Sequence, residues 1–463
     1  MALETWLIKV KIAVSNGLDT IKLHKNSTKK SNVRVLALEI AGLMSKLIHL
    51  WQSLSDKNIR RLRHESISLE GVRKIVSNDD AFLLSLACAE MVQNLRLLAK
   101  SVSRVSKHCK DDVGLQCFHH MFEEFSSRGL DPNGWVLSCK EMELKLKKMD
   151  RYVTLTMNLH KEMDEVSEIE HGLKKLMQST DTVKEKKIAD LQQKLFWHKQ
   201  EVKHLKEISL WGRSFDTVTL ILARSVFTVL ARIKLVFGIG PAIHGPCLPR
   251  SLSVSATVYP SETTTTCKFV SETLTMKASK LDHDKVNKQD DPINQNRFLK
   301  PPPSTLGAAA LALHYSNLII VIEKMIRSPQ LVGVDARDDL YAMLPTSIRV
   351  SLRARLRGVG FSANDPVLAG EWREALGRIL GWLSPLAHNM IKWQNERSFE
   401  QQNLIPKTNV LLLQTLYFAN QAKTEAAITE LLVGLNYIWR YEREMSSKAL
   451  LECSNLQKLQ TFG

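Results

Sequence analysis

Apolar residues spaced three and four positions apart are the feature that most restricts the fold of this 463-residue chain. The clearest run lies in residues 305–358, after three consecutive prolines at 301–303. Its members follow one another in steps of four, three, four and three: Leu311, Tyr315, Leu318, Ile322 and Met325. This spacing places them on one face of an α-helix, which must be buried. The run therefore predicts a helix that packs against other helices.

The same spacing recurs elsewhere, so we expect an all-α protein. Residues 33–54 and a segment starting near Asp79 each carry such a stripe, and a third helix between them would complete a small bundle. Residues 137–208 are rich in Lys, Glu, Leu and Met and are predicted to form long helices. Their second half contains a mostly apolar seam with one histidine: Ile188, Leu191, Leu195, His198, Val202 and Leu205. The seam fits an intramolecular helical hairpin or a dimerising coiled coil.

Changes in composition divide the chain into four parts. Residues 1–32 are predicted to be a basic N-terminal arm, and residues 33–237 an N-terminal helical domain. Residues 238–304 are rich in Ser, Thr and Pro and are predicted to be a disordered linker. Residues 305–463 form the C-terminal helical domain. We thus expect two helical bundles, the first with a long helical hairpin or coiled-coil-like segment, joined by a disordered polar linker.

Proline and capping residues set the expected helix ends in the C-terminal domain. A helix is expected to start at Pro366, because proline is well tolerated at the first helical position. It is expected to end at Ser384, because the residue before a proline avoids the helical region. Thr408 is expected to cap the last long helix.

The segment Phe215–Phe237 is the most apolar of the chain and is tested as a membrane span. Arg224 lies near its centre, and Arg232 and Lys234 follow. A spanning helix needs about 20 mostly apolar residues, and a central arginine costs about 2.5 to 3.5 kcal/mol on insertion scales. We therefore expect a buried or an interfacial helix and not a span.

Cysteine usage and the first residues favour an intracellular protein. The seven cysteines are scattered and form no CxxC pair, which fits a reducing compartment. The start lacks the basic-then-apolar layout of a secretory signal, and Ala2 excludes N-myristoylation, which needs glycine there. The nucleus, the cytoplasm and the membrane periphery all remain open.

No catalytic constellation is recognisable, so we expect no enzymatic activity, no cofactor and no small-molecule substrate. His119 and Glu123 would share a helix face, but no further metal ligand lies at a recognisable spacing. Gly238 and Gly240 complete neither of the glycine-rich nucleotide-binding motifs.

The net charge of +16 and the isoelectric point near 9.4 favour anionic partners. Acidic proteins, anionic membrane surfaces and nucleic acid all qualify. In residues 346–357, a stripe of arginines at steps of four runs beside an apolar stripe. The candidate partner-binding residues are Arg60, Arg61, Arg63, Arg349, Arg353 and Arg357. These side chains are expected to contact an acidic partner or to face solvent.

Two stretches resemble domains of one plant family. Residues 33–91, from VRVLALEIAGLM to SLACAEM, resemble a domain of unknown function numbered 3475. Residues 305–358, from TLGAAALALHYS to SLRARLRG, resemble a domain of unknown function numbered 668. Together they resemble the PSK SIMULATOR-like proteins, named for a link to phytosulfokine peptide-hormone growth signalling. The resemblance implies promotion of plant growth, with no enzymatic activity or cofactor and no catalytic residue to carry over.

One departure from the family bears on location. Members of the founding branch begin with Met-Gly and look myristoylated, whereas this chain begins with Met-Ala. A lipid-anchored location is therefore not implied for it.

The leading hypothesis is a non-enzymatic helical scaffold or adaptor in growth regulation, whose arginines contact an acidic protein. The alternative is a basic binding module for an anionic membrane surface or nucleic acid. Against nucleic acid, the aromatic residues do not interleave with the basic runs as base-stacking platforms would. The sequence leaves open the partner, the oligomeric state, the docking of the two bundles and the phosphorylation of the linker.

Overall fold

The structure of the chain is a computed structural model that describes residues 29–109, 113–177, 185–239, 300–329, 332–357, 363–398 and 409–460. Residues 1–28 of the predicted arm and residues 240–299 of the predicted linker lie outside these ranges. Within them the chain is helical and contains no β-strand, which confirms the all-α prediction. A single isolated antiparallel bridge joins Thr305 to Asn420 in this part of the chain.

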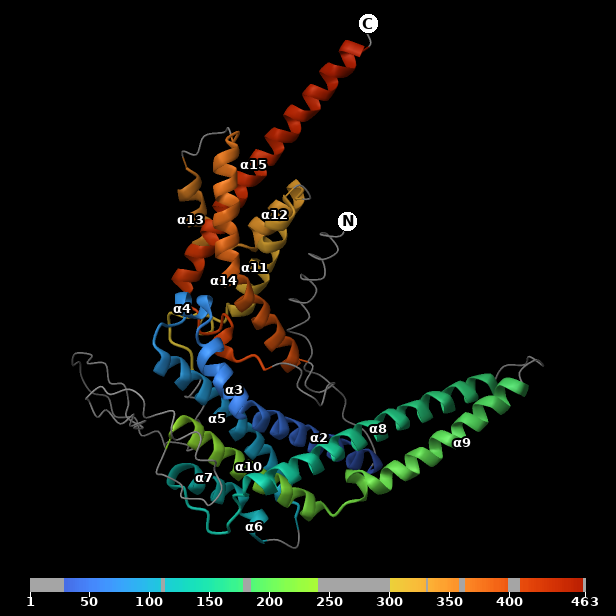
Figure 1. Ribbon diagram of the computed structural model, residues 1–463. Coiled ribbons are helices and arrows are strands. Elements are labelled where there is room, and N and C mark those ends of the chain that lie inside the picture. Colours follow the sequence, from blue (N-terminus) through green and yellow to red (C-terminus); the bar gives the residue numbers. More distant parts are fainter. Residues whose placement is uncertain are drawn as a thin grey trace, which may run out of the picture.

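Helices before the linker form the lower part of the molecule in Figure 1. Their bounds are α2 (Lys29–Ser53), α3 (Asp56–Arg61), a π-helical turn η1 (Leu62–Ser66), α4 (Glu70–Ile75), α5 (Asp80–Ser106), α6 (Val113–Gln116), α7 (Phe118–Arg128), α8 (Cys139–Met177), α9 (Glu185–Ile208), a 3-10 turn η3 (Leu210–Gly212) and α10 (Phe215–Phe237). The third helix expected between residues 54 and 79 is replaced by the short α3, η1 and α4. The bundle is completed instead by α8 and α10, which pack against α2 and α5.

Helices after the linker form the upper part in Figure 1. Their bounds are α11 (Ala312–Arg327), α12 (Val334–Met343), α13 (Thr346–Leu356), α14 (Pro366–Ser398), a 3-10 turn η7 (Leu412–Gln414) and α15 (Gln421–Gln460). The last helix begins at Gln421, where the side-chain oxygen of Asn420 accepts a hydrogen bond from the Lys423 amide. Thr408, the expected cap, lies outside the described residues.

The core of the first bundle is organised around α10. Most of its residues are buried, so the buried alternative expected for this apolar segment is confirmed. Phe227 of α10 contacts a cluster of rings from the loop and helix before α8. The cluster consists of Phe118, Phe122, Phe125, Trp135 and Phe227, with ring centroids between 4.9 and 6.1 Å apart.

The cations of α10 bind backbone carbonyls at the ends of other elements. Lys234 donates from Nζ to the carbonyl of Phe125 at 2.7 Å, near the C-terminus of α7. Arg232 donates to the carbonyl of Leu54 and pairs with Asp56 at 2.7 Å. The final carbonyls of a helix lack intrahelical donors and carry partial negative charge. These contacts explain why an otherwise apolar buried helix carries positive charges.

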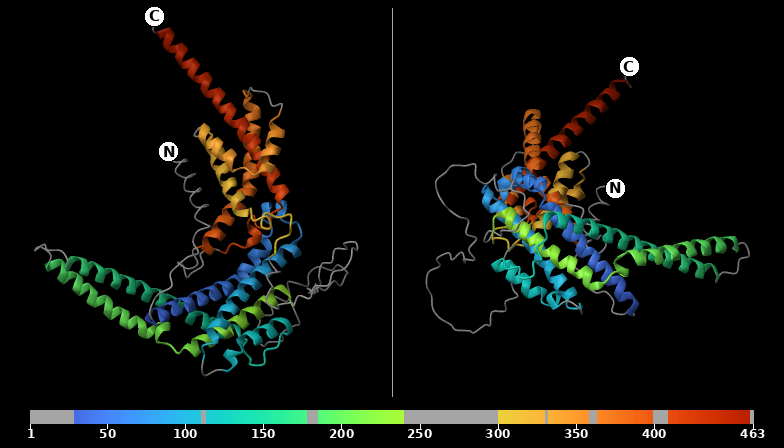
Figure 2. Two further views of the ribbon diagram at one scale, coloured as in Figure 1. Left: turned by 180° about the vertical axis from the view of Figure 1, so that it is seen from behind. Right: turned by 60° about the horizontal axis from the view of Figure 1, so that its bottom comes forward.

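The helices α8 and α9 form an antiparallel pair that projects from the bundle (Figures 1 and 2). Of the two structures expected for residues 137–208, the structure thus shows the helical hairpin. We call this projecting pair the α8–α9 arm. Near its base it is held to the bundle by α2, where Arg34 donates to Asp164 at 2.6 Å and to His160 at 2.9 Å.

The core of the second bundle lies between α11, α14 and α15. Four of the five residues of the predicted stripe are fully buried, and the fifth, Leu311 at the start of α11, is half-buried. Tyr315 crosses to α15, where its hydroxyl donates to Glu425 at 2.7 Å. Helix α13 packs on α15 through Ile348 and Leu352.

Helix α14 runs through Pro385, so the helix end predicted at Ser384 is wrong. Proline removes one helical hydrogen bond and crowds the carbonyl four residues earlier. Leu383 and Leu386, on the two sides of this position, are both fully buried in the second core. Their packing stabilises helical structure across the proline.

Only one helix among the described residues, α5, is long and apolar enough to cross a membrane. Buried helices of globular proteins pass the same test of length and composition, and α5 packs against α2, α7 and α10. The described part of the chain therefore contains no clear membrane span.

Candidate functional site

The six candidate arginines lie on two separate surfaces of the molecule. Arg60 and Arg61 end α3 and Arg63 lies in η1, whereas the other three belong to α13 and its C-terminal end. Figure 1 shows α3 beside α2 and α13 beside α15, with α4 and part of α14 between them. The two groups therefore form two surfaces and not one continuous patch.

The first group is partly occupied by contacts within the chain. Arg61 pairs with Glu65 at 3.0 Å, one helical turn away. Arg63 donates to the carbonyl of Val236 at 3.1 Å, and so joins η1 to the end of α10. Arg60 donates to the carbonyl of Asp56. All three side chains remain exposed, so their unused N–H groups can still reach a partner.

The second group surrounds the ring of Tyr341. Arg349 donates from Nε to the carbonyl of Leu344 at 2.9 Å, and its guanidinium lies 5.9 Å from the ring centroid. Arg353 lies 5.8 Å from the same centroid. Both distances are within cation–π range. Arg357 is exposed at the C-terminal end of the helix, where its backbone N–H bonds the carbonyl of Arg353.

Ion pairing distinguishes the arginines of this helix. Arg355 pairs with Glu430 of α15 at 2.8 Å. In the described part of the chain, Arg349, Arg353 and Arg357 form no ion pair with a carboxylate. We call these three residues with Tyr341 the α13 basic surface. It can accept a carboxylate from another molecule.

The sequence gives no sign of a buried glutamate at the junction of the two bundles. Glu90 of α5 is only 3 % exposed. One of its oxygens accepts the backbone N–H of Leu412 at 2.7 Å, and the other accepts the indole N–H of Trp393 at 3.4 Å. Burial raises the pKa of Glu90 from 4.5 to about 7, and these two bonds and the charge of Arg397 offset that rise only in part.

Close backbone contact accompanies this buried carboxylate. A Cβ atom at Gly71 of α4 would collide with the carbonyl oxygen of Trp382 on α14. The amide of Asn420 donates to the carbonyl of Ile75 at 2.7 Å. The two bundles are therefore docked through the α4–α5 segment.

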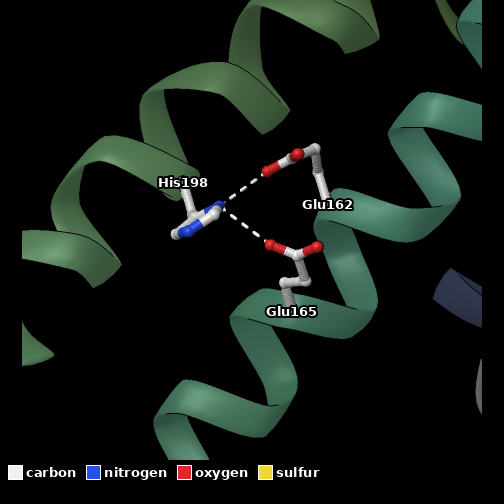
Figure 3. Close-up of side chains that lie close together, drawn as sticks. All are labelled: Glu162, Glu165 and His198. Atoms are coloured by element: carbon white, nitrogen blue, oxygen red, sulfur yellow. Dashed lines mark hydrogen bonds and ion pairs between the residues drawn. The ribbon is translucent and has the colours of Figure 1, made fainter.

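A second polar cluster lies inside the α8–α9 arm, where Figure 3 shows Glu162 and Glu165 of α8 facing His198 of α9. His198 donates from Nδ1 to Glu162 at 2.7 Å, and Glu165 lies 3.6 Å from the same nitrogen. One ligand atom from each residue lies within 4.8 Å of the others, so a metal ion could be held there. The histidine and the carboxylates also satisfy one another, which is sufficient to explain the cluster.

The metal pair considered in the sequence is not brought together with further ligands among the described residues. His119 and Glu123 are both exposed on α7. Their neighbours His120 and Glu124 form an ion pair at 3.8 Å. On α7, a histidine and a glutamate four residues apart therefore form a surface ion pair.

Comparison with known proteins identifies two domains of the chain. Residues 35–91 match a domain of unknown function, DUF3475, and residues 305–392 match a protein of unknown function, DUF668. The first covers α2 to the middle of α5, and the second covers α11 to most of α14. Gly71 and Trp382 belong one to each, so the two domains contact each other directly. Neither description names an enzymatic activity.

Similar proteins over most of the chain come from Arabidopsis thaliana. PSK SIMULATOR 1 is 26% identical over 428 residues, which is 89% of this chain and 56% of that protein. PSK SIMULATOR 3 is 26% identical over 427 residues, or 89% of this chain and 57% of that protein. PSK SIMULATOR 2 is 24% identical over 446 residues, which is 93% of this chain and 63% of that protein.

The chain spans somewhat more than half the length of these curated relatives. No solved structure matches it. The order of the two domains and the similarity over about nine-tenths of the chain lead to one assignment. The chain is a homologue of the plant PSK SIMULATOR proteins that carries a DUF3475 domain followed by a DUF668 domain.

Proposed function

We propose that this protein is a non-enzymatic helical scaffold or adaptor that promotes growth in a process linked to phytosulfokine signalling. The names of its homologues support the link to growth regulation, and the two domain descriptions point to no enzyme class. An adaptor must hold at least two partners apart from each other, so separate exposed surfaces on a rigid body are needed.

The α13 basic surface is the observation that carries the proposal. Arg353 and Arg357 are exposed and lack a carboxylate partner in the described part of the chain, whereas Arg355 between them has one. The ring of Tyr341 stabilises two of the guanidinium groups by cation–π contact, worth about 0.5 to 1 kcal/mol each at an exposed site. Guanidinium groups bind carboxylates through two parallel hydrogen bonds. The surface therefore suits an acidic segment of a partner protein.

The α8–α9 arm supplies a second surface, far along the molecule from α13 (Figures 1 and 2). Phe196 and Trp197 of α9 are adjacent in the chain, and more than half of each side chain is exposed. Exposed aromatic residues are enriched at protein interfaces. An arm with exposed aromatic residues midway along α9 and a body with a basic surface fit an adaptor that joins two proteins.

Charge reversal tests the proposal. The double variant Arg353→Glu, Arg357→Glu is compared with Arg104→Glu, Arg378→Glu, which carries the same net charge and changes two exposed arginines outside the α13 basic surface. Tagged full-length proteins are expressed in Arabidopsis thaliana seedlings, and the bound proteins are quantified by mass spectrometry. We expect the α13 variant alone to lose a set of acidic proteins.

Two outcomes would contradict this function. Equal recovery of every partner by both variants would leave the α13 basic surface as a solvated helix face. Binding of the purified protein to acidic vesicles or nonspecific DNA that falls steeply with salt, and is lost in the α13 variant, would favour the anionic-surface alternative.

A further inference from the structure

An open cavity of about 630 Å³ lies in the second bundle between α11, α14 and α15. Its apolar wall includes Leu376 and Leu380 of α14 and Leu435 and Ile438 of α15. The volume lies within the roughly 300 to 1,000 Å³ range of small-molecule sites. It is separate from the α13 basic surface and from the junction at Glu90.

Two glycines of α14 open one wall of this cavity. Gly377 and Gly381 are four residues apart and so lie on one face of the helix. A Cβ atom built on either would meet no atom within 4 Å, in contrast to Gly71, where it would collide with a neighbour. Glycine inside a helix is less favourable than alanine. Packing does not require these two glycines, and their effect is to leave space beside α14.

Unused hydrogen-bonding capacity lies beside that space. Ser384 is only 6 % exposed, and among the described residues its hydroxyl has no hydrogen-bond partner. Pro385 has no N–H, so the carbonyl of Gly381 lacks its regular helical donor. All three residues line the cavity. A buried hydroxyl without a partner is unfavourable, and a bound polar group would satisfy it.

Cationic groups gather at the mouth of the cavity. Buried Glu323 accepts a hydrogen bond from Arg327 at 2.5 Å and one from His388 at 2.7 Å, so both of its oxygens are occupied. Arg373 also lines the cavity and pairs with Glu442. Each guanidinium has five N–H donors and uses only some of them here. The remaining donors are available to an anion, and the charge of Glu323, a carboxylate of the cavity lining, is paired with Arg327.

We propose that this cavity binds a small amphipathic anion, with its apolar body against Leu376, Leu380 and Leu435 and its acid group at Arg327 and Arg373. Ser384 donates to or accepts from a polar atom of the same ligand. The site lies in the second bundle, and its lining shares no residue with the α13 basic surface.

Probe binding to the full-length protein tests the site. Anilinonaphthalene sulfonate, which combines aromatic rings with one anionic group, is titrated by fluorescence and then displaced by decanoate. The variant Gly381→Leu places a side chain in the cavity. Gly370→Leu is the matched control, because Gly370 lies on the same helix with equal free space but outside the cavity.

We expect Gly381→Leu to weaken binding of both probes by about tenfold or more. Gly370→Leu should bind as the original protein does. Gly377→Leu is measured as a second filling variant, and circular dichroism and thermal unfolding confirm that each variant is folded.

The acid group is tested by a second pair of variants. Arg373→Gln should weaken the binding of decanoate by about fivefold or more. The binding of decanol, its uncharged analogue, should change little. Arg378→Gln, on the same helix but outside the cavity, should change neither. Binding that is equal in the filling variants and the original protein would overturn the site. Decanoate and decanol binding equally well would overturn its preference for anions.

Discussion

Glu90 lies on α5 in the N-terminal half of the chain, yet both of its carboxylate oxygens accept hydrogen bonds from the C-terminal half. Its pKa is raised to about 7 because burial disfavours the charged form. A carboxyl group with a raised pKa in the folded state contributes stability that is fully present below pH 4.5. That contribution is lost as the pH rises through about 7.

The variant Glu90→Gln should remove this part of the pH dependence, because the amide stays uncharged. Relative to the variant, the original protein should lose about 3 kcal/mol of unfolding free energy between pH 4.5 and pH 8. Urea unfolding at several pH values measures the difference. The exposed Glu371→Gln should follow the original protein. Parallel pH profiles of Glu90→Gln and the original protein would show that Glu90 does not titrate in this window.

Ser384 gives a second prediction at the scale of one residue. Its buried hydroxyl lacks a partner in the part of the chain that the structure describes, so Ser384→Ala should raise the free energy of unfolding by about 1 kcal/mol. Ser316 is also buried, but its hydroxyl donates to the carbonyl of Ala312 at 2.8 Å. Ser316→Ala should therefore lower stability by about 1 kcal/mol. Thermal and urea unfolding compare the two, and an equal loss of stability in both would mean that Ser384 has a partner in solution.

At the scale of elements, periodic apolar residues allowed the all-α fold to be predicted. The stripes of α2, α5 and α11 are buried as expected, because each helix packs one face on its bundle. The sequence did not predict that α14 continues through Pro385, since that depends on the packing of Leu383 and Leu386 in the second core. The same holds for the junction at Glu90 and the cavity beside Gly381. Their partners lie on helices distant in sequence.

The α4–α14 contact is tested at Gly71. Because a Cβ atom there would overlap the carbonyl oxygen of Trp382, Gly71→Ala should force the two helices apart and cost about 1 to 3 kcal/mol. Gly172→Ala is the control, because its Cβ would meet nothing within 4 Å and alanine favours a helix interior by about 1 kcal/mol. Limited proteolysis and urea unfolding measure the change. If the Gly71→Ala variant were as stable as the Gly172→Ala variant, the two domains would not be docked at this contact.

At the scale of the whole molecule, two helical cores share one junction, and the exposed surfaces lie on its outer parts. The first core receives Leu412, Leu413 and Phe418 from the C-terminal half, and the second receives Ile75 from the N-terminal half. This exchange of buried residues fixes the position of the α13 basic surface relative to the α8–α9 arm. A scaffold requires such a fixed arrangement, because its partners must be held at a defined separation.

Growth promotion by the Arg353→Glu, Arg357→Glu variant shows whether the α13 basic surface is needed for function. Seedlings of Arabidopsis thaliana that express the original protein, this variant or the Arg104→Glu, Arg378→Glu control at equal levels are compared by root length. The α13 variant should fold normally and fail to promote growth, while the control promotes growth as the original protein does. Full growth promotion by the folded α13 variant would contradict the claim that this protein acts by contacting an acidic partner through the α13 basic surface.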